Sequence, residues 1–559
     1  MVMLMIGVHL FGAPLSLPCS GDVAVSAGAG FPVLGHTLPF LRDARALIER
    51  HRRRHGDVFT LRVLGRETTA FPHPDATREI YLDRERCLSS QGGWASSIGP
   101  MFSGGLMLRD FEDHHRHRLV MAHAFRRVAL DGYTERIHAV VDRHVARLPD
   151  GRVDAYAAVK AMTLDVATEV FVGASLGAQA RTVNNAFVAM MAASVTPVRV
   201  ALPGSRWARG QGARARLHRL LHELVAERRA RDEAPDLLSR LSHARDDSDA
   251  LLPAGEIVDH LSFVLLAAHD TTKATVAMML AELARRPDWQ SRVRAEIEAR
   301  DGEPVTVASH AALVDIGLVF REAIRLSPPV PFSPREVVAD TTIGGTPVKA
   351  GSLVSAASHG LHVHPEWWSD PQVFDPDRFG PARAEDKAHS HLFVPFGGGA
   401  HLCIGNHLAE IMAKVVVMRL LAGHRIVGDP GRPVVFTPVP IPRPGPTAHP
   451  PRPRHRFSHL TSSRRRRVCR CSRLHRREVV HRGQCPLGHD APLALLAGGE
   501  QIVAVGPQKG PLPRSPRRRH EISSSSTHRC ALGRGARPAP HGVRGADTSA
   551  GGYGGDRRQ

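Results

Sequence analysis

A single cysteine in a glycine-rich loop constrains this chain more than any other feature. The loop, residues 396–405, reads Phe-Gly-Gly-Gly-Ala-His-Leu-Cys-Ile-Gly and precedes a helical pattern over residues 406–421. Glycine lets backbone pass close to a large, flat partner, and N–H groups near a helix N-terminus favour a thiolate at Cys403. A thiolate held in this way is a metal ligand or a nucleophile, and the glycine-lined space favours an axial ligand to a haem iron. Taken alone, such a cysteine is also compatible with a small buried hydrophobe.

Most of the net positive charge of the chain lies in its C-terminal tail. The total is +20, but the residues from Pro446 onward carry 23 Lys and Arg against 6 Asp and Glu, which leaves +3 for the rest. The charge of the residues before Pro446 therefore does not indicate a surface that binds nucleic acid or membranes. Cys19, Cys87 and Cys403 are the only cysteines before residue 445, which suits a reducing compartment and predicts a cytoplasmic protein.

The first 30 residues form a leader of uncertain status. Residues 1–19 are mostly apolar but are broken by Gly7, Gly12 and Pro14, and a membrane-spanning helix needs about 20 apolar residues. No Lys or Arg precedes the run, so a secretory signal is not indicated. A misplaced start codon or a disordered leader is the preferred interpretation, and membrane association through residues 1–19 stays open.

Residues 31–444 read as one domain that is mainly α with small β-sheets. Residues 31–40 are expected to be an extended entry segment, and residues 57–64 and 66–71 alternate like a strand hairpin. Short strands are expected near residues 340–343, 346–348 and 352–356. Apolar residues at helical spacing predict helices over residues 41–54, 75–84, 112–127, 130–147, 155–173, 181–193, 211–231, 253–286, 288–301 and 309–326.

The tail, residues 445–559, is rich in Arg, Pro, Gly and Ser and has almost no periodicity. Such a composition cannot bury enough apolar surface to offset its ordering entropy, so we expect disorder. A shifted reading frame in GC-rich DNA would give the same composition. Cys469, Cys471, Cys485 and His489 do not have the paired spacing of a zinc site.

The cysteine loop resembles the haem-binding loop of the cytochrome P-450 family. Phe396, Gly399, His401, Cys403 and Gly405 fill the specified positions of that pattern. The resemblance extends over roughly residues 31–444. It implies the family's fold, with a long central helix across the haem and the cysteine loop on the opposite face. It also implies haem b as the cofactor, with Cys403 as the axial ligand of the iron.

Two further motifs support this resemblance. Glu322 and Arg325 lie three residues apart on a helix and so share a face, and the segment around Arg378 resembles the family's second arginine motif. The resemblance implies that these three residues form a buried network beneath the haem. Asp270 and Thr271, in Ala-Ala-His-Asp-Thr-Thr, resemble the oxygen-activation motif, with the acid relaying protons and the threonine hydroxyl facing dioxygen.

Four cations and donors are expected to bind the two haem propionates. His114 and Arg118 match the family's His-x-x-x-Arg pattern, Arg335 matches its propionate arginine, and His401 precedes the thiolate by two residues. Carboxylates prefer such partners. His117, beside the first pair, is expected on a solvated face.

The function that the resemblance implies is a haem-dependent monooxygenase acting on a hydrophobic small molecule. The resemblance also implies that dioxygen is the oxidant and that a separate ferredoxin or flavoprotein supplies the electrons. This donor is expected to dock on the Cys403 face, near Arg116, His123 and Arg126. Apolar residues expected to line the substrate pocket are Ile98, Met101, Phe263, Leu266, Ala267, Val330 and Phe332.

Two alternatives remain at this stage. A haem-thiolate peroxygenase or isomerase would not need dioxygen, but such enzymes generally lack the acid–threonine pair. A nucleic-acid-binding protein is suggested by the basic tail, which has the charge but no recognisable fold for base readout. The sequence withholds the substrate, the position of oxidation, the redox partner and the oligomeric state.

Overall fold

Helices make up most of the residues that the structure describes. The computed structural model describes residues 35–427, except 64, 149–154, 174–178, 195, 197–198, 235 and 247, together with 436–437, 443–444, 493–497 and 501–507. The chain divides into two compact units, Met1–Leu512 and Pro513–Gln559, and all described residues lie in the first. Mostly helical structure with small sheets is the expected fold class, and it is confirmed.

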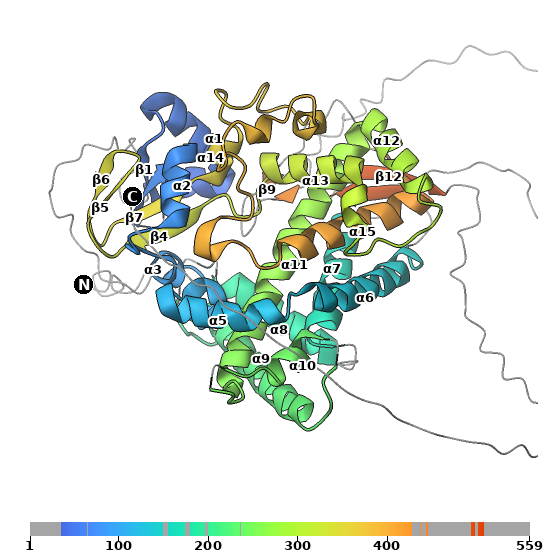
Figure 1. Cartoon of the computed structure of the whole chain (residues 1–559), viewed down its shortest axis with the longest axis horizontal. Coiled ribbons are helices and arrows are strands. Elements are labelled where there is room, and N and C mark those ends of the chain that lie inside the picture. Colours follow the sequence, from blue (N-terminus) through green and yellow to red (C-terminus); the bar gives the residue numbers. More distant parts are fainter. Residues whose placement is uncertain are drawn as a thin grey trace, which may run out of the picture. The chain divides into compact units, whose positions relative to one another are not determined.

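The longest helix, α11 (Ala254–Arg285), packs against several other helices (Figure 1). Most of its residues are buried, as is typical of a helix surrounded by other elements. The helices that contact it include α7 (Ala155–Phe171), α9 (Arg206–Arg229), α13 (Val314–Leu326) and α15 (Asn406–Gly423). The predicted helix over residues 253–286 is confirmed.

Other helices also agree with the sequence pattern to within a few residues. They are α2 (Pro74–Leu82), α5 (Phe111–His123), α6 (Arg127–Val145), α8 (Gln179–Ser194) and α12 (Pro287–Glu298). Helices too short to show a clear period were not predicted. These are α3 (Ser90–Ala95), α4 (Gly99–Phe102), α10 (Leu237–Ser242) and α14 (Ser358–His362).

A five-stranded sheet has the order β1-β2-β7-β4-β3. Its strands are β1 (Phe59–Val63), β2 (Arg66–Phe71), β3 (Leu88–Ser89), β4 (Ser333–Val337) and β7 (Leu353–Ala356). The expected hairpin of β1 and β2 is confirmed, and β2 continues parallel to β7. A second expected hairpin joins β5 (Thr341–Ile343) to β6 (Thr346–Val348). Strand β4 was not predicted, and it contains Pro334, which lacks a backbone donor and is uncommon within strands.

The entry segment contradicts its prediction in part. Residues 31–40 were expected to be extended, but helix α1 (Thr37–His55) begins inside this segment. Pro39 lies in the first turn, where a backbone N–H has no helical acceptor, so the proline does not prevent the helix. The helix is interrupted at Asp43, where φ is −160° and ψ is 91°.

The tail contains regular structure where disorder was expected. Strands β11 (Leu493–Ala497) and β12 (Gln501–Pro507) are antiparallel, and β12 pairs with β8 (His424–Val427). The prediction is therefore wrong for these two strands, whose apolar runs flank Gly-Gly, a hairpin signal. The leader and the possible zinc ligands lie outside the described residues. Within the described part of the chain, no helix combines the length and apolar character that crossing a bilayer requires.

Candidate active site

The loop that carries Cys403 is fixed by its backbone. The Cys403 N–H donates to the Phe396 carbonyl oxygen at 2.9 Å, and Gly405 caps the N-terminus of α15. Gly399 has a φ of +60°, and a Cβ atom there would lie 1.8 Å from the Tyr81 carbonyl oxygen. Both the left-handed conformation and the close approach of α2 therefore require glycine.

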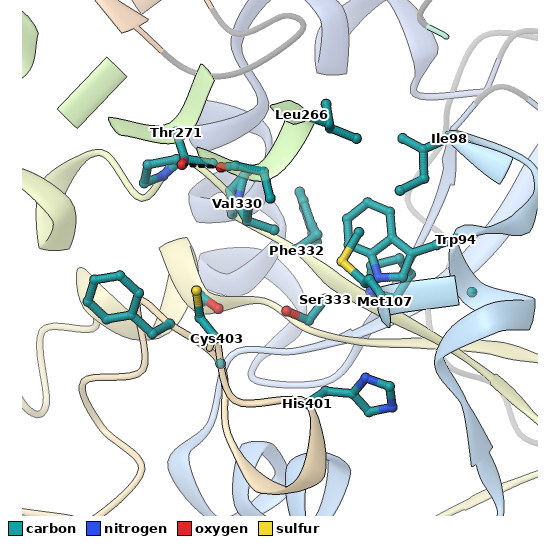
Figure 2. A pocket seen from close by; sticks show the side chains of 18 of the residues that line it. Trp94, Ile98, Met107, Leu266, Thr271, Val330, Phe332, Ser333, His401 and Cys403 are labelled. Carbon is teal, nitrogen blue, oxygen red and sulfur yellow. Dashed lines mark hydrogen bonds between the residues drawn. The ribbon is translucent and has the colours of Figure 1, made fainter. Parts of the chain in front are cut away.

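Cys403 borders a cavity of about 680 Å³. Figure 2 shows Cys403 and His401 on one side of this cavity, and Thr271, Leu266 and Ile98 on the other. Cys403 is exposed where it borders the cavity. Its removal from bulk water raises the pKa of the Cys403 thiol, while the Gly405 N–H and the Arg118 charge act in the opposite direction. The volume is within the range of ligand and cofactor sites.

The four expected cations and donors meet at one edge of the cavity. The rings of His114 and His401 lie 4.0 Å apart between centroids, and His114, His401, Arg118 and Arg335 all line the cavity. Arg335 is 5% exposed, and its guanidinium donates to the Pro334 carbonyl oxygen at 2.9 Å. Strand β4 and helix α5 therefore bring together residues that are far apart in the sequence.

This edge of the cavity has the electrostatics of an anion site. Among the described residues, neither Arg118 nor Arg335 forms an ion pair, and the buried Nε2 of His114 has no hydrogen-bond partner. Burial and the Arg118 charge lower the pKa of His114 to about 4. Burial and the Arg335 charge lower the pKa of His401 to about 2. A buried arginine and a half-buried one, neither of them in an ion pair among the described residues, fit a ligand with two carboxylates, such as haem.

Helix α11 presents Thr271 and Asp270 to different surroundings. Thr271 lines the cavity, and its hydroxyl donates to the Ala267 carbonyl oxygen at 2.6 Å (Figure 2). Asp270 is 5% exposed, does not line the cavity, and accepts a hydrogen bond from the Lys273 ammonium. The sequence contains this pair at a spacing of three residues, which places both on one helix face, but Lys273 was not considered.

The expected ionic network is present as a fully buried cluster. Glu322, Arg325 and Arg378 are each 0% exposed. Arg325 donates to both Glu322 carboxylate oxygens, at 2.6 and 2.8 Å, and Arg378 donates to one of them at 3.1 Å. The second carboxylate in the cluster, Glu385, accepts from Arg378 at 2.7 Å.

Most of the expected apolar pocket residues border the cavity. They are Ile98, Phe263, Leu266, Ala267, Val330 and Phe332. Met101 is the exception, because it is 0% exposed and belongs to the core. Met107, which was not predicted, lines the cavity instead.

The residues around α5 differ from the expected solvated face. His117 is 1% exposed, and its Nδ1 lies 2.8 Å from Nε2 of His260 on α11. Its spacing of three from His114 could have indicated a shared buried face. Arg116 contacts His117 and Glu256, whereas Arg126 is exposed and donates to His123.

Comparisons with known proteins agree with this geometry. A sequence model of one family, described as Cytochrome P-450, matches residues 26–438. A Mycobacterium tuberculosis protein named as cytochrome P-450 136 is 38% identical over 420 residues, covering 73% of this chain and 84% of that protein. Abscisic acid 8'-hydroxylase 2 of Oryza sativa subsp. indica is 31% identical over 435 residues, covering 74% and 84%. The solved structure of retinoic acid bound cyanobacterial CYP120A1 is similar with a TM-score of 0.68 and 26% identity, covering 74% and 95%.

Proposed function

The chain belongs to the cytochrome P-450 family, and from that premise we propose that it inserts one atom of dioxygen into a C–H bond of a hydrophobic small molecule. It is an oxidoreductase of the P-450 monooxygenase type, with haem as its cofactor. The observation that most supports the proposal is the cavity itself. Cys403 and Thr271 lie on its opposite sides, and two arginines without acid partners among the described residues lie at its edge.

We propose that this chain holds the haem through five side chains. The Cys403 sulfur would bind the iron, and His114, Arg118, Arg335 and His401 would receive the two propionates. Phe396, Gly399 and Gly405 would shape the loop that carries Cys403. When bound in this way, haem supplies oxygen chemistry, and thiolate ligation favours O–O cleavage.

The protein's own part in the reaction is to exclude water and to move protons. The cavity is lined mainly by apolar side chains, which would favour a hydrophobic substrate over water. The Thr271 hydroxyl donates to Ala267, so its oxygen lone pairs stay free to accept a proton donor. For Asp270 to supply that proton, its side chain must leave the Lys273 ammonium and turn toward Thr271.

Replacing Asp270 with asparagine is expected to lower turnover with dioxygen and reductant by about 10²-fold, the usual scale of a lost proton-transfer group. Substrate affinity is expected to stay unchanged, because Asp270 does not line the cavity. Product formed per dioxygen consumed, measured beside substrate titrations, checks both statements. Lys273→Gln is the matched variant on the other side of the ion pair. Unchanged turnover in Asp270→Asn would remove Asp270 from the relay.

A second candidate function has one observation in its favour. Asp270 is hydrogen-bonded to Lys273 and does not line the cavity. A haem-thiolate peroxygenase or isomerase does not need an acid at the cavity to deliver protons to dioxygen. Such an enzyme would turn over with hydrogen peroxide alone at the rate reached with reductant and dioxygen. Comparing the two rates on one preparation separates the candidates.

The electron donor that we propose is a ferredoxin or flavoprotein that docks near Arg126. Phe125, next to it in the chain, lines the cavity and lies 4.0 Å from a Cβ placed on Gly405, so Arg126 is close to the Cys403 loop. Arg126 and His123 are exposed, and Arg126 has no acid partner among the described residues. Arg116 is less suited than expected to contact the electron donor, because it is already hydrogen-bonded to Glu256 and His117.

Arg126→Glu is expected to slow reduction by an acidic ferredoxin about tenfold at low ionic strength, because surface charges steer such encounters. The difference from the native protein should shrink as salt screens the charges. Stopped-flow reduction across a salt series measures both effects. Arg219→Glu, on an exposed part of α9, is the matched control. A rate indifferent to salt and to Arg126→Glu would contradict this docking surface.

The test of the proposed function is a carbon monoxide difference spectrum of the reduced protein, followed by turnover with labelled dioxygen. One labelled atom in the product is expected. Two relatives carry the names of hydrophobic acids, abscisic acid and retinoic acid, so such compounds are reasonable first substrates to screen. A protein that binds no haem, or a product whose new oxygen comes from water, would contradict the proposal.

A further inference from the structure

Two buried histidines form a chain of contacts that leads from the exposed Arg116 to the cavity. His117 on α5 and His260 on α11 are each 1% exposed, and their rings lie 4.9 Å apart between centroids. His260 lines the cavity, as do Val264 and Thr271 on the same face of α11. Eleven residues separate His260 from Thr271, which is about 16 Å along a helix axis. His260 therefore lies at the end of the cavity remote from the proposed oxygen site.

The contacts of this pair fix the position of each ring proton. Arg116 Nη2 lies 2.7 Å from His117 Nε2, and a guanidinium can only donate. His117 Nε2 must therefore accept, which leaves the proton of the neutral ring on Nδ1. That Nδ1–H donates to Nε2 of His260 across 2.8 Å. The neutral His260 ring then carries its own proton on Nδ1.

The competing arrangement is disfavoured by distance. If His117 donated through Nε2 to Asp113 or Glu256, those oxygens would lie at 3.4 and 3.7 Å. Two N–H groups would then also face each other across the 2.7 Å contact with Arg116. Both rings are neutral near pH 7, because burial lowers the pKa of His117 and lowers that of His260 to about 3.

The result is a buried hydrogen-bond donor on a residue that borders a ligand cavity. Nδ1 of His260 has no partner in the part of the chain that the structure describes, and leaving a buried donor unpaired is costly. The cavity that His260 borders is lined mainly by apolar side chains, among them Leu106, Met107 and Phe263. An oxygen atom on a bound molecule would satisfy the donor.

We propose that His260 binds a carbonyl or carboxylate oxygen of the substrate and that Arg116 and His117 set its ring as a donor. This inference rests on the proposed function and names the substrate class: an apolar molecule with an acceptor oxygen at one end. Holding that oxygen at His260 directs the opposite end of the molecule toward Thr271. Selection arises because an analogue without the oxygen leaves the buried donor unpaired.

The experiment measures dissociation constants of the haem-loaded protein for matched ligands, by isothermal titration and by shifts of the Soret band. The probes are chain-length-matched sets of an alkane, a methyl ketone, a carboxylic acid and a secondary alcohol. In the native protein, the best ketone or acid is expected to bind at least about tenfold more tightly than its alkane. Comparing the ketone with the acid tells a neutral carbonyl from a carboxylate. Equal affinities within every set, or no oxygenated probe that binds, would overturn the inference.

Two substitutions at His260 separate the donor from the shape of the ring. His260→Gln can place an amide where Nε2 meets His117 but offers no donor at the Nδ1 position, so the preference for ketone or acid is expected to disappear. His260→Asn can place an amide N–H near the Nδ1 position and is expected to retain most of the preference. The opposite order, or an equal loss in both, would contradict a donor role.

Arg116→Met tests whether the arginine sets the ring protons. Without the guanidinium, His117 can donate to Asp113 or Glu256, which reverses both bonds and turns His260 Nδ1 into an acceptor. The variant is expected to lose the preference for the ketone while keeping that for the alcohol, which can donate. A purely structural role of Arg116 would lower both affinities together. The carbon monoxide difference spectrum is recorded for the native protein and for each variant. A native protein without the thiolate band would count against the proposed function, whereas a changed ligand preference with the band intact tests the role of His260 alone.

Discussion

Replacing Cys403 with serine is expected to abolish the carbon monoxide band of thiolate-ligated haem and to reduce turnover by at least about 10³-fold, or about 4 kcal/mol in the barrier. A serine hydroxyl does not supply the anionic sulfur that favours O–O cleavage. The fold is expected to survive, because the loop is held by the backbone bond from Cys403 to Phe396 and by glycine conformations. Difference spectroscopy of the reduced protein and circular dichroism measure the two outcomes.

The matched control for this substitution is Cys87→Ser. Cys87 is the other free cysteine in the described part of the chain, and it is buried beside Asp83, whose carboxylate lies 3.6 Å from the sulfur. A serine hydroxyl can donate to the same carboxylate, so spectrum and turnover should stay close to those of the native protein. A Cys403→Ser protein with the native spectrum would show that another group holds the iron.

Features that depend on neighbours in the sequence could be predicted. The Cys403 loop and helix α15 are adjacent in the chain, and Glu322 and Arg325 occupy one face of one helix. Long apolar periodicity gave α11 its bounds to within one residue. In each case the local sequence carries the information, because spacing along a helix determines which side chains share a face.

Contacts between distant segments could not be predicted in the same way. His117 and His260 lie 143 residues apart, and their meeting depends on how α5 packs against α11. The choice of Met107 over Met101 for the cavity depends on the path of a short loop. Asp270 shows a different failure, since its partner Lys273 is only three residues away but lies just outside the motif on which the prediction rested.

Proline and short apolar runs account for the errors in the fold. Pro39 and Pro334 are residues that disfavour regular structure, yet one lies in the first turn of α1 and the other in β4. Proline is tolerated where its missing donor is not needed. The strands at Leu493–Ala497 and Gln501–Pro507 were hidden by the basic composition around them.

Removing one member of the Glu322 cluster is expected to cost about 3–5 kcal/mol of stability, as it does for other buried ion pairs that lose a partner. Native domains have only about 5–15 kcal/mol in total, so Glu322→Gln should give little folded, haem-loaded protein. The carboxylate accepts from both Arg325 and Arg378 and from the Asp375 N–H at 2.8 Å. Thermal unfolding and the haem content of the soluble fraction measure the loss. The exposed pair of Asp340 and Lys349 supplies the control, because Lys349→Gln should leave the melting temperature nearly unchanged.

The cluster also predicts how two losses combine. If Glu322 serves mainly to neutralise the buried arginines, then Arg378→Gln should destabilise the native protein more than it destabilises the Glu322→Gln protein, because the second change removes a charge that the first has left unpaired. Glu385 limits this recovery, since it keeps its own bond to Arg378 in the single variant. Chemical denaturation of the four proteins gives the coupling energy directly. Strict additivity of the two substitutions would show that the three side chains contribute independent packing and not one electrostatic unit.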